Sequence, residues 1–190
     1  MEKNEIKTVV TEFYSEIAKG SNNSEKDDIS KSIGYSQEDL NSIPNEANLG
    51  LGCGNPQKIA EPQKGEIVVD LGCGRGMDVF LASKKVGNDG MAIGIDMTYD
   101  MLSRAREIAK KNDFKNVDFR LGEIENLPVG DNLADVVLSN CVINLSTDKQ
   151  RVYDEIFRIL KPGGRFGISD ITLDIPLPNE VVEDPRMYGS

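Results

Sequence analysis

The residues best placed to do chemistry form a glycine-rich loop. It contains Asp70 and three glycines at alternate positions, Gly72, Gly74 and Gly76. An apolar, β-branched run precedes the acid, and a helical pattern follows the last glycine. A glycine loop between a strand and a helix is typical of nucleotide binding, because glycine lets a ligand approach the backbone and the helix N-terminus offers free N–H groups. The alternative is a tight turn without a ligand.

The spacing of these glycines differs from the dinucleotide fingerprint Gly-x-Gly-x-x-Gly, in which a helix N-terminus holds a pyrophosphate. The glycines here read Gly-x-Gly-x-Gly. With an acid two residues before the first glycine, the loop resembles the first motif of the S-adenosylmethionine-dependent methyltransferases. Their ligand carries a cationic sulfonium, an amino-acid end and an adenosine, which suits a nearby acid. Asp70 then either bonds the backbone N–H groups of the loop or faces the amine of the ligand.

Two further acids follow later predicted strands. Asp96 lies 24 residues after Gly72, near the distance at which an acid hydrogen-bonds ribose hydroxyls. Glu123 follows the third strand, and we expect it to accept from the adenine amino group, with Ile124 beside the ring. The alternatives are a solvated turn acid for Asp96 and a surface acid, within a pair with Glu125, for Glu123.

The chain has three cysteines and no histidine, which excludes Ser-His-Asp and Cys-His mechanisms from this chain alone. Cys73 lies inside the glycine loop, where a small residue suffices. Cys53 belongs to the first of two Leu-Gly-Cys-Gly copies, at 51–54 and 71–74, and Cys141 follows the fourth predicted strand. A free cysteine is usually a small buried apolar residue. The other hypothesis is that Cys53 and Cys141 act as a pair over one crevice.

The elements that position these residues alternate between strand and helix over residues 61–173. This pattern predicts an α/β fold with a Rossmann-like, doubly wound, mainly parallel sheet that binds its ligand at the carboxyl ends of the strands. Five strands are expected, at 67–69, 91–95, 117–121, 134–139 and 165–169.

For residues 1–60 we predict an N-terminal helical extension and a cysteine-bearing loop. Within it we expect an amphipathic helix over 3–18, a loop over 20–32, a short helix capped by Ser36 and a turn at Asn55-Pro56. Residues 174–190 hold three prolines and predict an extended tail. The fifth strand would be a sheet edge, so we expect that tail to cover it or another chain to pair with it.

Composition narrows the partners to small molecules. The net charge is −10, which argues against nucleic acid and anionic membranes. No apolar run approaches a membrane span of about 20 residues. The N-terminus lacks the apolar core of a signal peptide, and three cysteines in such a chain favour reduced thiols in the cytoplasm.

Specific segments resemble the arsenite methyltransferases, a class I S-adenosylmethionine-dependent family. The likeness runs from Gly34 to about Ile171. Its general motifs are VVDLGCGRGMD at 68–78 and LKPGGRFGISDI at 160–171, and its more specific ones are ANLGLGCGNP at 47–56 and LSNCVINLSTDK at 138–149.

The resemblance implies a division of roles. It assigns the binding of trivalent arsenic to the thiolates of Cys53 and Cys141, with a third thiol from elsewhere, and it implies no resident metal. Soft thiolates suit thiophilic arsenic, and its lone pair attacks the sulfonium methyl without a base. An external thiol of glutathione or thioredoxin type would serve as reductant. The cofactor S-adenosyl-L-methionine would be held by Asp70, Gly72, Cys73, Gly74, Asp96, Met97, Gly122, Glu123, Ile124 and Asn140.

The sequence also differs from the family. It lacks the extra cysteines that the family often carries in the N-terminal loop. The family continues with another arsenic-binding cysteine, the last strands of a seven-stranded sheet and a C-terminal domain, so we expect a fragment or a divergent relative. Two alternatives follow. The protein methylates another small molecule, using Asp, Glu or Tyr as a base, or it only binds a nucleoside or metalloid without turnover.

Overall fold

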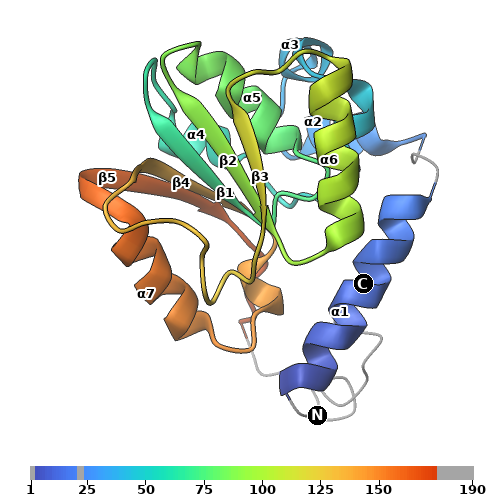
Figure 1. Cartoon of the computed structure of the whole chain (residues 1–190). Coiled ribbons are helices and arrows are strands. Elements are labelled where there is room, and N and C mark those ends of the chain that lie inside the picture. The colour runs from blue at the N-terminus through green and yellow to red at the C-terminus, as the bar shows by residue number, and fades with distance from the viewer. Residues whose placement is uncertain (1–2, 21–23, 175–190) are drawn as a thin grey trace.

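The core of the protein is a parallel sheet of five strands in the order β3-β2-β1-β4-β5 (Figure 1). The computed structural model describes residues 3–20 and 24–174. The strands are β1 (Ile67–Leu71), β2 (Met91–Asp96), β3 (Val117–Leu121), β4 (Ala134–Asn140) and β5 (Leu160–Ser169). The predicted α/β class, parallel sheet and N-terminal helix are confirmed.

Helices cover both faces of the sheet (Figure 1). The helices are α1 (Lys3–Lys19), α2 (Lys26–Ser32), α3 (Gln37–Ser42), α4 (Pro56–Ala60), α5 (Met77–Val86), α6 (Tyr99–Lys111) and α7 (Lys149–Ile159). Helices α4, α5 and α6 share one hydrophobic core with one side of the sheet, and α7 shares another with the opposite side. Among the described residues, none of the helices has both the length and the apolar character that crossing a bilayer requires.

Alternation along β1 explains the two cores. Val68 faces the core of α5 and α6, whereas Val69 and Leu71 face the core of α7. All three side chains are fully buried, as expected for the central strand of a parallel sheet. Because successive side chains point to opposite faces, Asp70 falls on the side of α5, where the glycine loop begins.

The strand order creates a switch point beside β1. The chain passes from β1 to β2 and β3 on one side and then crosses to β4 on the other. Connections diverge between the carboxyl ends of β1 and β4, and open α/β sheets bind ligands in the resulting crevice. The glycine loop follows β1 and Cys141 follows β4, so the topology places both at this crevice.

The N-terminal segment differs from the prediction in two places. The predicted loop over 20–32 contains α2, because tertiary contacts stabilise its polar residues. The Ser30 hydroxyl donates to Asn48 at 3.0 Å, and the Lys26 ammonium donates to the Asn45 carbonyl at 2.5 Å. The predicted turn at Asn55 is instead the N-cap of α4, with the Asn55 side chain accepting from the Lys58 N–H at 3.2 Å.

The segment before residue 61 shares the core of the sheet. Tyr35, Leu40 and Ala60 are buried with α5 and α6. The division at residues 60 and 173 stays a prediction. Strand β5 begins at Leu160 rather than 165 and lies at one edge of the described sheet. The tail predicted to cover it lies, from residue 175 on, outside the described residues.

Candidate functional site

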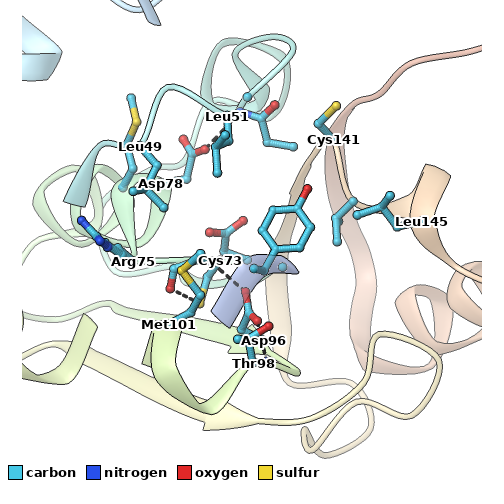
Figure 2. Close-up of a pocket in the computed structure, with 18 of the residues that line it drawn as sticks. Leu49, Leu51, Cys73, Arg75, Asp78, Asp96, Thr98, Met101, Cys141 and Leu145 are labelled. Atoms are coloured by element: carbon cyan, nitrogen blue, oxygen red, sulfur yellow. Dashed lines mark hydrogen bonds between the residues drawn. The ribbon is translucent and has the colours of Figure 1, made fainter. Parts of the chain in front are cut away.

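A cavity opens at the carboxyl ends of β1, β2 and β4 (Figure 2). Its walls come from the glycine loop, the end of β2, the loop before Cys53, the turn after β4 and one side of α1. Of the residues predicted to bind cofactor or arsenic, those that line it are Asp70, Gly72, Cys73, Gly74, Asp96, Met97, Gly122, Ile124, Asn140 and Cys141. The topology therefore brings together residues that are up to 71 positions apart, from Asp70 to Cys141.

The three glycines of the loop have positive φ values, of 64°, 53° and 89° for Gly72, Gly74 and Gly76. This region of backbone conformation favours glycine. A Cβ at Gly72 would also lie 2.4 Å from the Val142 side chain. At Gly74 the nearest atom would be Leu49 Cδ1, at 4.0 Å, so there the loop presents bare backbone to open space, as a nucleoside-type ligand requires.

Asp96 holds the glycine loop and the start of α6. Its carboxylate accepts from the Gly74 N–H at 2.9 Å and from the Thr98 N–H at 2.8 Å. Burial raises the pKa of Asp96, and these N–H donors oppose that shift. The Thr98 side chain and the Met97 N–H also interact with this carboxylate. Each carboxylate oxygen can accept more than one hydrogen bond, so Asp96 can also accept from a vicinal diol such as that of ribose.

Asp70 and Asp78 add two more buried carboxylates to the same crevice. Burial raises the pKa of Asp70 well above its usual value, and repulsion by Asp78 and Asp96 adds to this effect. Within the described part of the chain, no hydrogen bond reaches the Asp70 carboxylate, so the loop N–H bond predicted as one alternative is made by Asp96 instead. Three buried carboxyl groups, Asp70, Asp78 and Asp96, therefore lie in one cavity, and a cationic ligand would favour their ionised forms.

Glu123 does not line the cavity, which corrects its predicted place. Its side chain is 51% exposed and pairs with Lys7 of α1 at 2.5 Å. Its neighbour Glu125 lines the cavity with Ile124. Both Glu123 and Glu125 follow β3 in the sequence. Only the path of the backbone after β3 decides which of these two acids faces the cavity.

Cys141 occupies a strained backbone position at the end of β4. Its φ is +58°, an uncommon value for a residue other than glycine, and such strain concentrates at functional sites. The Cys141 N–H donates to the Ser169 carbonyl at 2.7 Å, which fixes the turn against β5. Cys141 lines the cavity. Figure 2 shows its side chain well apart from that of Asp96.

Cys53 lies next to Cys141 but behind the cavity wall. Its Sγ is 3.5 Å from the Ser169 carbonyl oxygen. Burial raises the pKa of Cys53 to about 12, and a hydrogen bond with Cys141 contributes further. The structure thus brings the two predicted thiols into one site, although Cys53 and Cys141 are 88 positions apart in the sequence. All three cysteines are free.

Cys73 is different, because it is buried beneath the loop. Its side chain packs against Gly94 of β2, where an added Cβ would lie 2.7 Å from the Cys73 sulfur. Burial raises the pKa of Cys73 well above its usual value, and the charges of Asp96 and Asp70 add to this. Cys73 is a small core residue that also touches the cavity.

Asn140 has a contact that its sequence position did not suggest. Its Oδ1 accepts from the Cys53 N–H at 3.0 Å, and its Nδ2 donates to the Gly54 carbonyl at 3.0 Å. The side chain therefore binds the cysteine loop, although it also lines the cavity to which it was assigned as a cofactor ligand.

Helix α1 supplies a wall of the cavity that sequence reasoning missed. Val10 and Tyr14 line the cavity, and their apolar spacing had indicated only a packing face. Arg75 of the glycine loop donates to the carbonyls of Ile17 and Ala18 at 3.2 and 2.9 Å, in the last turn of α1, where carbonyls lack partners within the α-helical pattern. This contact fixes α1 over the crevice.

Comparison with known proteins points to one family. Residues 62–190 match the model of a methyltransferase domain. An arsenite methyltransferase of Halobacterium salinarum is 53% identical over 156 residues, which make up 82% of this chain and 40% of that protein. A human arsenite methyltransferase is 36% identical over 80% of this chain and 43% of its own length. The chain thus spans about two fifths of the length of these relatives.

Solved structures agree with the sequence matches. An arsenic(III) S-adenosylmethionine methyltransferase from Chlamydomonas reinhardtii superposes with a TM-score of 0.65 at 36% identity, over 85% of this chain and 55% of that one. A S-adenosylmethionine-dependent methyltransferase from Aquifex aeolicus shares the fold, with a TM-score of 0.58 at 24% identity.

Proposed function

Because the chain belongs to the methyltransferase domain family, we propose that it binds S-adenosyl-L-methionine in the cavity and methylates trivalent arsenic held by Cys53 and Cys141. The observation that carries this proposal is the meeting of two free thiols, Cys53 and Cys141, of which Cys141 lines the same cavity as Asp70, Asp78 and Asp96. The likeness to arsenite methyltransferases supports the choice of substrate.

The cavity fits this cofactor in charge and shape. When bound, S-adenosyl-L-methionine supplies an electrophilic methyl group on a cationic sulfur. Asp96 offers acceptors for ribose hydroxyls, Gly74 offers open backbone, and Ile124 offers an apolar surface for a base. Asp70 offers a carboxyl group to a cation or an ammonium group, and such a ligand would oppose the rise that burial causes in the pKa of Asp70.

The cysteines would bind and orient the substrate. Arsenous acid condenses with two thiols and releases two waters, so both sulfurs end as thiolate ligands without a net proton change. An external thiol fills the third position, and the arsenic lone pair then points away from the three sulfurs. That lone pair would form the As–C bond, and the electrons of the broken C–S bond would stay on the sulfur of S-adenosyl-L-methionine. No proton leaves the nucleophile, so a site without histidine is sufficient.

The substrate requires reduced thiols throughout. Methyl transfer formally oxidises arsenic from +3 to +5, so each further round needs two electrons, which we assign to external thiols of glutathione or thioredoxin type. The proposal also places the protein in a reducing compartment such as the cytoplasm, where free cysteines persist.

The proposal is tested by methyl transfer. The protein is incubated with arsenite, glutathione and S-adenosyl-L-methionine labelled in its methyl group, and methylated arsenic is separated and counted. We expect product that depends on thiol and on Cys53. Transfer to a different small molecule with Cys53 dispensable would replace arsenic as the substrate. Binding of both ligands without product would show that these residues form a binding module.

A further inference from the structure

Asn140 connects the two cysteines of the proposed arsenic site. It precedes Cys141 in the chain, so the peptide bond fixes it to one cysteine. Its side chain is hydrogen-bonded to the other, because Oδ1 accepts from the Cys53 N–H and Nδ2 donates to the Gly54 carbonyl, both at 3.0 Å. A Cβ at Gly52 would lie 2.7 Å from Asn140 Nδ2, so a glycine is needed for the loop to lie this close.

The direction of these bonds depends on two buried neighbours. The Tyr35 hydroxyl lies 2.9 Å from both carboxylate oxygens of Asp78, and a carboxylate can only accept. Tyr35 therefore donates to Asp78, and its oxygen is left to accept from Asn140 Nδ2 at 3.0 Å. Asp78 Oδ2 is a second acceptor for the same group, at 3.4 Å.

This arrangement selects one of the two orientations of the Asn140 amide. With the NH2 group facing Tyr35 and Asp78, the carbonyl oxygen must face the Cys53 N–H. The reverse orientation would place two acceptors together and two donors together. Tyr35 and Asp78 are 4% and 7% exposed, and a buried hydrogen bond is costly to leave unmade.

We propose that Asn140 is the positioning residue that sets the separation of the Cys53 and Cys141 thiols, and that Asp78, acting through Tyr35, fixes the orientation of its side chain. The inference deepens the proposed function and rests on it. Gln57 of α4 also holds Asp78 in place, since its Nε2 donates to the Asp78 carbonyl at 2.8 Å. The cavity and the cysteine loop thus share Asp78, Tyr35 and Asn140 as a common wall.

The first test removes one hydroxyl. Tyr35→Phe keeps the ring but removes one of the acceptors of Asn140 Nδ2, which keeps the Gly54 carbonyl and the longer contact to Asp78. Tyr14→Phe is the matched control, since Tyr14 lines the same cavity outside this chain of hydrogen bonds. Two quantities are measured, the hydrogen-exchange rate of the Cys53 amide and the affinity for phenylarsine oxide, which bridges two thiols. For Tyr35→Phe we expect exchange about tenfold faster and affinity about tenfold weaker. For Tyr14→Phe we expect no change in the exchange rate.

The second test changes the orienting carboxylate. Asp78→Asn should accelerate exchange of the Cys53 amide, whereas Asp70→Asn, an equally buried carboxylate outside the network, should not. Asn140→Asp should weaken phenylarsine oxide binding more than Tyr35→Phe does. Combining it with Asp78→Asn should restore part of the loss, because the double variant again pairs a donor with an acceptor between positions 78 and 140.

The outcomes separate this inference from the proposed function. If Tyr35→Phe leaves Cys53 exchange and arsenical affinity unchanged, or if Tyr14→Phe has the same effect on both, the positioning role is wrong. If the unmodified protein does not bind phenylarsine oxide, the arsenic site is wrong and the inference that rests on it falls too. In that case the exchange rate of the Cys53 amide still reports whether Asn140 holds the loop that contains Cys53.

Discussion

The chain contains the tetrapeptide Leu-Gly-Cys-Gly twice, and the two copies have different structures. In the copy at 71–74, Leu71 ends β1 and Cys73 is buried. The Cys73 N–H donates to the Ile95 carbonyl at 3.0 Å. The copy at 51–54 lies outside helices and strands, with Cys53 partly exposed and its N–H bound to the Asn140 side chain.

The glycines of the two copies have different tasks. Gly72 and Gly74 have positive φ, whereas a Cβ at Gly54 would lie 1.7 Å from the Ser169 hydroxyl oxygen. One copy needs glycine for a turn and the other for close approach to a neighbouring strand. Under the proposed function, identical residues serve as a cofactor loop in one place and a substrate loop in the other, because the neighbours in space decide which atoms the cysteine meets.

The largest expected effect distinguishes the cysteines of the two copies. Cys53→Ser and Cys141→Ser should each weaken phenylarsine oxide binding by about 10²–10⁴-fold, because the second As–S bond is intramolecular and benefits from a high effective concentration. Cys73→Ser should leave the affinity nearly unchanged. Isothermal titration gives the three affinities, and circular dichroism checks that each variant is folded.

The comparison fails if Cys73→Ser is the damaging change, or if both other variants still bind the arsenical tightly. Either result would make the Cys53–Cys141 contact structural. Affinity for S-adenosylhomocysteine should survive loss of Cys53 or Cys141, since neither sulfur is assigned to the adenosine.

A smaller loss of ligand affinity is expected from removing Asp96, which is hydrogen-bonded to Gly74 in the copy at 71–74. Asp96→Ala removes the acceptor of the Gly74 N–H together with the charge proposed to bind the ribose. The loss should be about 1.5–3 kcal/mol, or roughly ten- to hundredfold in affinity for S-adenosylhomocysteine by calorimetry. Phenylarsine oxide binding should change little. Unchanged cofactor affinity would place the ribose elsewhere and separate the second copy from the cofactor.

The smallest effect concerns the reactivity of Cys53. A raised pKa lowers the thiolate fraction at any pH below it, so alkylation at pH 8 should be slow and should accelerate as the pH rises toward about 12. Cys141→Ala removes the hydrogen bond and charge that add to the effect of burial. The Cys53 alkylation rate at pH 8 should then rise about three- to tenfold.

The readout is mass spectrometry of iodoacetamide-labelled peptides. Buried Cys73 should stay unlabelled in the folded protein of either variant, which serves as the internal control. An unchanged Cys53 rate in Cys141→Ala would show that the two thiols do not interact in solution.

The elements of the fold follow from local patterns in the sequence. The β-branched run before Asp70 predicted the central strand, and apolar spacing predicted α1. The alternation of strand and helix patterns over residues 61–173 predicted α5, α6 and α7, because burial of one face drives these patterns. The sequence also predicted Ser36 as the N-cap of α3, and the structure shows a complete capping box between Ser36 and Asp39. The glycine loop and Asp96 fall at strand ends, so the parallel topology alone was enough to bring them to one crevice.

Long-range contacts decided the rest. Helix α2 forms in a segment of low apolar content because Ser30 and Lys26 bond to residues that follow it by up to 19 positions. The choice of Glu125 over Glu123 at the cavity depends on the backbone path after β3. The role of Asn140 depends on Cys53, 87 residues earlier.

The sequence by itself determined the five strands, the glycine turn and all the described α-helices except α2 and α4, since propensity and periodicity act among neighbours in the chain. It also indicated which thiols to consider. Only the tertiary structure decided that Cys53 and Cys141 lie together, that Cys73 does not join them, and that Asn140, Tyr35 and Asp78 connect the cavity to the cysteine loop. The physical reason is that hydrogen-bond direction and burial depend on partners brought together by folding, which no local pattern encodes.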